Sequence, residues 1–308
     1  MGRQIEGRCK YRFGSAIVKT LDKVGQQIYP ETNHKTGFNG MQEIHLATDG
    51  LPVRKSGKWA ERKHHYLKNY CGITTVSMRN KFKLVYLDVM AGPGRCKIEE
   101  TGEEFAGSPL IALEHDFSQY IFIEDEPELV QALKHRVAKH PKAEKAKIIP
   151  ENWINYAQTG KLKFDDSTLV VAFVDPTGIS QVPMSAMKIL ARNPRVDLLV
   201  TIQYRLGIVW NVPQYLKAKG NETALDNFLD EPTWREWEGK EAGEFGRMAV
   251  ESFCEKFQRD SGFIGTRHVS IPEKNPLYRF TLFSRHPLAQ NFWHKILKID
   301  EKGQRELL

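Results

Sequence analysis

Five short apolar runs, each followed by polar or turn residues, recur through the middle of the chain. Segments in which apolar residues return every three or four positions separate them and indicate helices. This alternation predicts a doubly wound α/β fold with a mostly parallel sheet, because each crossover helix returns the chain to the same edge. The predicted strands are residues 84–89, 120–123, 146–149, 168–174 and 196–204.

After the fifth strand the pattern changes. Residues 206–250 contain three tryptophans and many charges but no long apolar run, which predicts a helical insertion on the substrate side. A helix over residues 246–258 resumes the alternation. Residues 265–271 and 277–284 then predict an antiparallel strand pair. The predicted fold class is therefore a Rossmann-like α/β sheet, closed by an antiparallel C-terminal strand pair.

Ahead of the first strand, residues 56–70 have an apolar stripe at helical spacing, and Ser56 is the predicted N-cap. On this helix, Lys63 and His64 are expected to overhang the loop after the first strand and to contact substrate. The competing interpretation is an amphipathic helix that only docks its aromatic residues on the sheet. Residues 94–107, which are rich in charge, are predicted to form a long loop.

Polar residues stand at the ends of four predicted strands: Asp88, Glu124, Asn152 and Asp175. The carboxyl ends of parallel strands share one edge of a sheet, and open α/β sheets bind ligands in the crevice there. Taken singly, each residue is equally typical of a helix cap or a turn. Four in series favour a binding site.

The loop after the first strand reads DVMAGPGR over residues 88–95. A dinucleotide-binding loop needs GxGxxG, but Lys97 stands where the third glycine is required, and the next helix begins only near Ser108. No GxxxxGK[ST] phosphate-binding loop occurs either. S-adenosylmethionine has no phosphate to cradle, so this loop suits it better than NAD.

Each part of S-adenosylmethionine has a predicted contact. The ammonium group is assigned to Asp88, and the ribose hydroxyls to an acid after the second strand. The cofactor-binding residues are Asp88 for the ammonium, the open backbone at Ala91, Gly92 and Gly94, Glu124 (with Asp125 second) for the ribose, and Asn152 for adenine.

The fourth strand runs into Asp175, Pro176 and Thr177, which we predict to be the catalytic residues. Asp175 would orient or deprotonate the methyl acceptor, and Pro176 sets the backbone that follows. Amino-methyltransferases that act on bases often carry a stacking aromatic at this turn. Thr177 is not aromatic, so the acceptor atom stays open. Tyr204 and Arg205, at the end of the fifth strand, are predicted to bind substrate.

The formal charge of +7 is concentrated at the start of the chain. Residues 1–80 contain 14 Lys and Arg against 6 Asp and Glu, whereas the remainder is nearly balanced. Clustered cations bind polyanions by releasing condensed counterions, which suggests a nucleic-acid partner. A solvated face on a mildly basic protein explains the same excess equally well. We therefore divide the chain into a basic N-terminal extension, residues 1–55, and a cofactor-binding domain, residues 56–308.

No apolar run approaches the roughly 18 residues of a membrane span, and the first residues lack the apolar centre of a signal peptide. A cytoplasmic protein without a membrane partner is expected. The four cysteines contain no CxxC pair, so reduced thiols are expected and no metal site is predicted.

Six segments carry a family resemblance: KWAERKHHYLKNY (58–70), YLDVMAGPGR (86–95), GSPLIAL (107–113), FIEDEPE (122–128), FVDPTG (173–178) and YRFTLFSRHPLAQNFWHKI (278–296). Together they resemble the three-Cys-motif partner protein family (TcmP-like proteins), which has a methyltransferase-like fold. The resemblance implies S-adenosylmethionine binding at Asp88, Gly92, Gly94 and Glu124, and a radical-SAM-like partner that carries the three cysteines of the family name.

The leading hypothesis is thus an S-adenosylmethionine-dependent methyltransferase that modifies RNA or DNA together with this partner. One alternative is a catalytically inactive module that binds the cofactor or nucleic acid. Another is a methyltransferase of small molecules, which would show no salt-dependent retention on nucleic acid.

Overall fold

The structure, a computed structural model, describes residues 45–218, 222–265, 268–272 and 274–299. Most of the predicted extension, residues 1–55, lies outside the described residues, and so does Cys9. The described part belongs to one compact unit of the chain. None of its helices combines the length and apolar character that crossing a bilayer requires.

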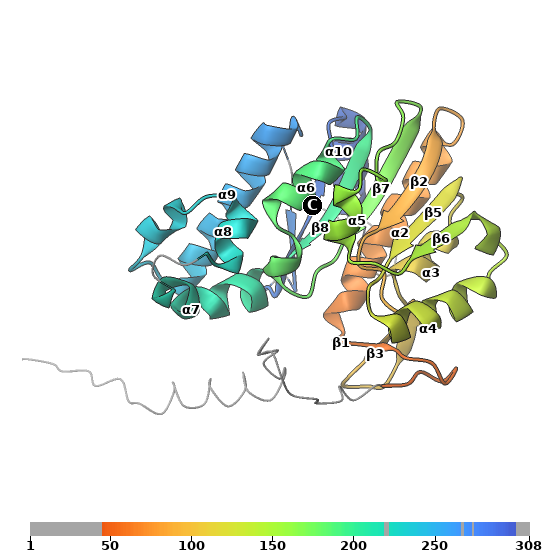
Figure 1. Cartoon of the computed structure of the whole chain (residues 1–308), viewed down its shortest axis with the longest axis horizontal. Helices are drawn as coiled ribbons and strands as arrows, with labels where there is room; N and C mark the ends of the chain where they lie inside the picture. Colours follow the sequence, from red (N-terminus) through yellow and green to blue (C-terminus); the bar gives the residue numbers. More distant parts are fainter. Residues whose placement is uncertain (1–44, 219–221, 266–267, 273, 300–308) are drawn as a thin grey trace, which may run out of the picture. The chain divides into compact units, whose positions relative to one another are not determined.

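A seven-stranded sheet forms the centre of this unit, in the order β6-β5-β2-β7-β8-β10-β9 (Figure 1). Neighbours from β6 to β8 pair in parallel, whereas β10 is antiparallel to both β8 and β9. The predicted antiparallel C-terminal pair is thereby confirmed. The strands are β2 (Lys83–Asp88), β5 (Gln119–Ile123), β6 (Ala146–Ile149), β7 (Thr168–Val174), β8 (Val196–Ile202), β9 (His268–Ile271) and β10 (Tyr278–Phe283).

The central strands are apolar on both faces because helices cover the sheet on both sides. Every residue of β8 is buried, and in β7 only Leu169 is not fully buried. In the register of β2 with β7, Asp88 pairs with Phe173, so these two strands end side by side. Their carboxyl ends therefore deliver two acidic residues, Asp88 and Asp175, to neighbouring positions.

Two apolar cores flank the sheet. One contains Leu67, Leu133 and Trp293, and the other contains Trp153, Met187 and Phe253. The first core is covered by α2 (Trp59–Met78), α3 (Ser108–Leu113), α4 (Pro127–Ala138) and α10 (Pro287–Ile296), and the second by α5 (Trp153–Gln158), α6 (Met184–Ala191), α8 (Ala224–Leu229) and α9 (Ala242–Ser261).

The described elements of the predicted insertion, residues 206–250, are all helical, with short turns among them. The insertion begins within η3 (Tyr204–Ile208) and includes η4 (Val209–Asn211), α7 (Val212–Lys217), α8 and η5 (Thr233–Trp237). The fully buried Trp234 anchors it, since its Nε1 donates to Asp226 Oδ1 at 2.8 Å. The helix that resumes the alternation, α9, begins at Ala242, earlier than predicted.

The prediction of a long loop over residues 94–107 was wrong. This segment forms an antiparallel hairpin of β3 (Arg95–Ile98) and β4 (Glu104–Ala106), and β1 (Arg54–Ser56) adds to it in parallel, next to β3. Strands this short are too brief for their alternation to stand out in a sequence.

Ser56 is likewise not a helix cap, because it ends β1 and α2 begins at Trp59. With β3 and β4, β1 forms a small three-stranded sheet, so residues 54–56 belong to the folded unit. The expected division between residues 55 and 56 therefore falls inside β1.

Candidate active site

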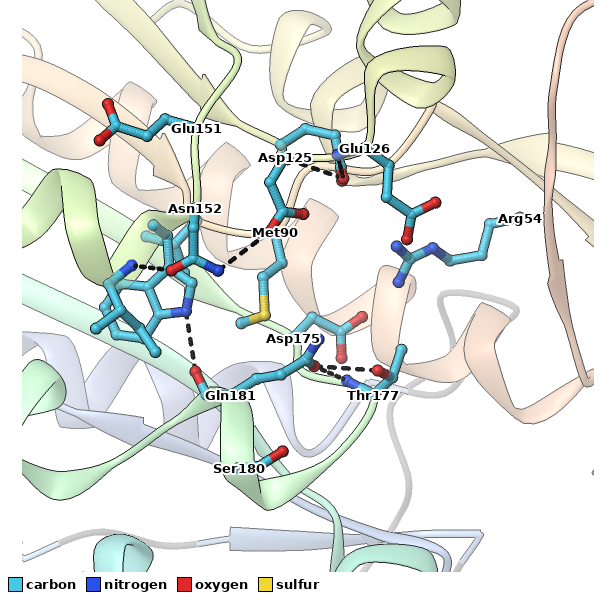
Figure 2. Close-up of a pocket in the computed structure, with 14 residues that line it drawn as sticks. Arg54, Met90, Asp125, Glu126, Glu151, Asn152, Asp175, Thr177, Ser180 and Gln181 are labelled. Carbon is cyan, nitrogen blue, oxygen red and sulfur yellow. Dashed lines mark hydrogen bonds between the residues drawn. The ribbon is translucent and has the colours of Figure 1, made fainter. Parts of the chain in front are cut away.

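A cleft opens at the carboxyl ends of β2, β5, β6 and β7 (Figure 2). It contains about 680 Å³ of empty space, its solvent-open mouth included, which is in the range of small-molecule sites. Its position is the one at which open α/β sheets bind ligands. The lining residues are Arg54, Val89, Met90, Glu124, Asp125, Glu126, Glu151, Asn152, Trp153, Ile154, Asp175, Thr177, Ser180 and Gln181.

The glycine loop after β2 turns sharply. Gly92 and Gly94 adopt left-handed backbone conformations, with φ of 64° and 84°, which residues with a Cβ rarely tolerate. The Ala91 amide donates to Ile123 O of β5 at 2.9 Å, and the Gly107 amide donates to Gly94 O at 2.8 Å. The loop is thus fixed through its backbone, and within it Val89 and Met90 face the cleft.

Asp88 lies behind this loop and does not line the cleft. It is fully buried, and the Tyr86 hydroxyl donates to its Oδ2 at 3.2 Å. Burial raises the pKa of Asp88 to about 7, because an ionised carboxylate without water is costly. The predicted ammonium ligand therefore backs the loop in this structure.

Glu124 joins the loops of two neighbouring strands. Its Oε2 accepts the Gly92 amide at 2.7 Å, and its Oε1 accepts the amides of Asp125 and Glu126 at 3.1 and 3.0 Å. A carboxylate offers about four acceptor positions. Three are used here, so Glu124 keeps one for a ligand at the cleft.

Two further predicted contacts lie beside Glu124. Asn152 caps α5 by accepting the Ile154 amide at 3.1 Å, and its Nδ2 donates to Asp125 Oδ2 at 3.0 Å. Trp153, which follows, donates from Nε1 to the Gln181 carbonyl at 2.9 Å. The structure therefore brings the strand-end residues of β5 and β6 together on one wall of the cleft (Figure 2).

Asp175 forms an ion pair with Lys63 of α2. Lys63 Nζ lies 2.5 Å from Asp175 Oδ2, and both side chains are largely buried. Burial alone would raise the pKa of Asp175, but the charge and hydrogen bond of Lys63 outweigh it and leave that pKa lowered. Asp175 is therefore a fixed, ionised acceptor rather than a proton-accepting base.

Glutamine side chains hold the rest of this turn. The Gln181 Oε1 accepts the Thr177 amide at 2.7 Å and the Thr177 hydroxyl at 3.0 Å. Gln203 Nε2 donates to the carbonyl of Pro176, which is buried behind the cleft. Thr177 itself is exposed at the cleft, so this turn presents a hydroxyl and no aromatic ring.

The other residues predicted to bind substrate do not line the cleft. His64 is buried against the Phe105 ring, 5.5 Å between centroids, and burial lowers its pKa to about 3. The Tyr204 hydroxyl donates to Gly243 O at 3.0 Å, while the Arg205 amide donates to Leu277 O at 3.0 Å. Lys63 reaches the site only through Asp175.

Sequence reasoning missed Arg54, Met90, Glu126 and Gln181, which line the cleft. Met90 and Glu126 are adjacent to predicted positions. Arg54, in contrast, comes from a segment with no apolar pattern. No cluster of three or more metal-ligating side chains occurs within the described ranges, and Cys71, Cys96 and Cys254 are buried and free.

A scan against protein-family models finds no match, and a search of curated proteins finds no similar sequence. Among solved structures, protein LPL1258 of Legionella pneumophila is similar in fold, with 12% identity and a TM-score of 0.45 over 75% of this chain and 87% of that one. TYW2 of M. jannaschii, solved in complex with AdoMet, has 10% identity and a TM-score of 0.38 over 75% and 78%. The protein yhhF of Escherichia coli, a provisionally assigned methyltransferase, has 14% identity and a TM-score of 0.40 over 77% of this chain and 91% of that one.

These likenesses are too distant to assign a ligand or a reaction to this chain. The strand order identifies the fold class by itself. Antiparallel β10 is inserted between β8 and β9 at the end of a parallel sheet, and this is the doubly wound, mostly parallel Rossmann-like sheet with an antiparallel C-terminal strand pair that the sequence predicts.

Proposed function

We propose that the protein is an S-adenosylmethionine-dependent methyltransferase. The observation that carries the proposal is the hydrogen bond between Glu124 and the Gly92 amide. It joins Glu124, an acid at the end of β5 that lines the cleft, to the left-handed glycine turn that follows β2. This arrangement offers acceptors for a ribose diol and lacks the third glycine and tight helix start of a dinucleotide site.

The residues present fit this cofactor. One ribose hydroxyl has the open acceptor position of Glu124, and the second has the carboxylate of Asp125 or Glu126. The adenine end suits the wall of Asn152, Trp153 and Ile154. The positively charged sulfonium suits a cleft whose lining includes five carboxylates.

When bound, the cofactor would supply an electrophilic methyl group. The chain's own contribution is positioning: Asp175, ionised and held by Lys63, accepts a hydrogen bond from the acceptor's amino or hydroxyl group and aims its lone pair. Holding an acceptor in a near-attack geometry accelerates transfer strongly. Thr177 offers an additional hydroxyl beside it.

Nucleic acid is the substrate we propose, on the support of the basic excess in residues 1–80. From the resemblance to three-Cys-motif partner proteins, we also propose a radical-SAM-like partner. A second candidate is a catalytically inactive module that binds the cofactor or nucleic acid. The ion pair of Asp175 with Lys63 favours it, since that pairing makes Asp175 a poor general base.

Transfer of tritiated methyl groups to total cellular RNA and DNA, with and without the partner, separates the two candidates. We expect label in one polymer with the wild type, and a loss of about 100-fold in Asp175→Asn with cofactor binding retained. The matched control is Asp166→Asn, an exposed aspartate ahead of β7. Cofactor binding without any transfer would establish the second candidate instead.

A further inference from the structure

Arg54 is a cation in the cleft that the proposed reaction does not use. We propose that Arg54 binds the carboxylate of the cofactor's methionine moiety. Residues 45–56, here called the strap, then hold Arg54 at the cofactor site and are not part of a polymer-binding extension; of the strap, only Arg54 lines the cleft. This inference rests on the proposed function.

The charges of the cleft single out Arg54. Among the described lining residues, five carry carboxylates and Arg54 alone carries a positive charge. Its guanidinium makes no hydrogen bond or salt bridge with another described side chain. It lies beside Glu126 in the cleft, where its charge offsets part of the rise in the pKa of that carboxyl (Figure 2). The methionine carboxylate is the one negative group of the cofactor, and an otherwise acidic cleft would repel it without a cation. A guanidinium matches a carboxylate in a two-pronged hydrogen bond.

Arg54 also lies at the appropriate end of the cleft. Figure 2 shows it reaching in from the side opposite Asn152, with Met90 and Asp175 between them. A Cβ on Gly92 would lie 3.4 Å from Arg54 Nε, so the guanidinium is beside the glycine loop. With adenine against the Asn152 wall, the far end of an extended cofactor is its methionine carboxylate.

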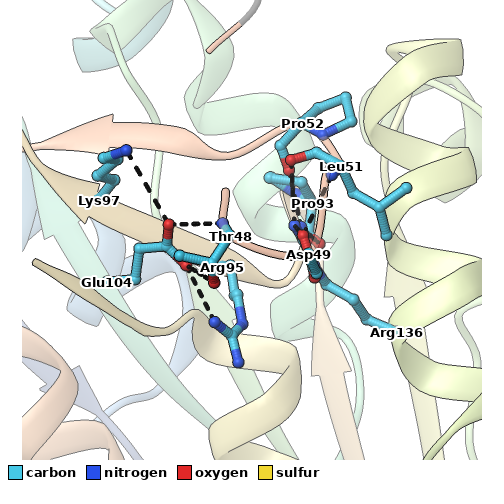
Figure 3. A network of polar contacts seen from close by, with 9 residues as sticks. All are labelled: Thr48, Asp49, Leu51, Pro52, Pro93, Arg95, Lys97, Glu104 and Arg136. Carbon is cyan, nitrogen blue, oxygen red and sulfur yellow. Dashed lines mark hydrogen bonds and ion pairs between the residues drawn. The ribbon is translucent and has the colours of Figure 1, made fainter. Parts of the chain in front are cut away.

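A buried arginine fixes the strap from one side (Figure 3). Arg136 of α4 binds Asp49 in a two-pronged ion pair, with Nε–Oδ2 and Nη2–Oδ1 distances of 2.8 Å. The same guanidinium donates from Nη1 to the carbonyls of Pro52 at 2.7 Å and Pro93 at 2.6 Å. One side chain therefore ties the strap directly to the glycine loop.

Contacts with the β3–β4 hairpin fix the strap from the other side. The amide and hydroxyl of Thr48 donate to Glu104 at 2.8 and 3.0 Å, and Arg95 also donates to Glu104 at 3.0 Å (Figure 3). In the β1–β3 ladder Arg54 pairs with Cys96. The backbone of Arg54 is thus held in place before any ligand arrives, which reduces the part of the chain that binding must order.

The test compares two ligands that differ only at the methionine end. S-adenosylhomocysteine carries the carboxylate and ammonium groups, whereas 5′-methylthioadenosine lacks both, and both have a neutral sulfur. In calorimetric titrations Arg54→Gln should weaken S-adenosylhomocysteine about 10- to 100-fold and methylthioadenosine less than about twofold. Arg54→Lys, which keeps the charge but not the fork, should lie between.

The matched control is Lys55→Gln, which removes the same charge from the next residue of β1. Lys55 is exposed and pairs with Glu99, so both ligands should bind as in the wild type. Equal melting temperatures of the variants would show that each is folded.

The outcomes separate this inference from the proposed function. If the wild type binds neither S-adenosylmethionine nor S-adenosylhomocysteine, the proposed function fails. A second result is that the wild type binds both cofactors while Arg54→Gln lowers the affinity for S-adenosylhomocysteine and for methylthioadenosine by the same factor, or leaves both affinities unchanged. Either outcome overturns only the inference. The inference is also overturned if Arg54→Gln binds both ligands as the wild type does but is retained less on nucleic acid in a salt-dependent way. Arg54 would then contact a phosphate of the nucleic acid.

Discussion

The two central strands β2 and β7 lie side by side, and each has an aspartate at its carboxyl end, yet the surroundings shift the pKa values of the two carboxyl groups in opposite directions. Asp88 is fully buried beside the Tyr86 hydroxyl, and burial raises its pKa to about 7. For Asp175, burial is outweighed by Lys63, which leaves its pKa lowered. The fold sets where an acid stands, and its neighbours set its charge.

Because of this difference, the carboxyl ends of β2 and β7 have different roles. The end of β2 supports a loop through backbone hydrogen bonds, glycine conformations and a carboxyl group that can hold a proton. The end of β7 presents a permanent negative charge to the cleft. The group that receives the methyl must be held by a fixed hydrogen-bond acceptor beside it. For this reason we propose that transfer takes place at Asp175.

Breaking the ion pair should give the largest effect on stability. Lys63→Met leaves Asp175 as a largely buried charge without its cation, and we expect a loss of about 3 kcal/mol in the free energy of unfolding. Urea denaturation measures it. The double variant Lys63→Met/Asp175→Asn should recover most of the loss, since no unpaired charge remains. An equal loss in the single and double variants would show that Lys63 stabilises by packing alone.

The pH dependence of Asp88 gives the next effect. The folded protein holds the Asp88 proton up to about pH 7, whereas an ordinary aspartate loses it near 3.8. The folded state therefore binds more protons in this window, so this carboxyl makes stability fall as pH rises through it. Asp88→Asn stays neutral. Relative to the wild type, it should gain about 2–3 kcal/mol between pH 5 and pH 8.

Urea denaturation of both proteins at the two pH values checks this expectation. A difference that does not change with pH, or that changes in the other direction, would show that Asp88 is ionised throughout. The contrast between the two strand ends would then disappear.

The glycine loop gives the smallest effect. Gly92→Ala places a Cβ in a left-handed conformation and should cost about 1 kcal/mol. Gly160→Ala is the control, because Gly160 has a φ of 75°, nothing within 4 Å of its added Cβ, and no place in the strap or the cleft lining. Both variants should lose similar stability, but Gly92→Ala alone should weaken cofactor binding. Equal cofactor affinity in the two variants would show that the glycine loop is not part of the cofactor site.

Much of the sheet is predictable from the sequence, because buried parallel strands appear as apolar runs and their ends fall on one edge. The convergence of Glu124, Asn152 and Asp175 follows from that rule alone. The helix α2 extends to Met78, beyond the predicted end at residue 70, because its buried face continues through Cys71, Thr74 and Thr75. Small and polar residues of this kind give no apolar signal.

The remainder depends on tertiary contacts between distant residues. Lys63 and Asp175 are 112 residues apart, and Arg136 meets Asp49 across 87 residues. No local pattern signals either pair. Arg54 reaches the cleft only because the hairpin β3–β4 forms and accepts β1, and strands of three or four residues are too short to be recognised in advance.

The most direct measurement is calorimetric titration of S-adenosylmethionine into the wild type and into Glu124→Ala. We predict saturable binding in the micromolar range to the wild type. Glu124→Ala should weaken it markedly, because that substitution removes both a ribose acceptor and the link to Gly92. Absence of binding at millimolar cofactor, or equal binding by the two proteins, would contradict the assignment of this cleft to S-adenosylmethionine.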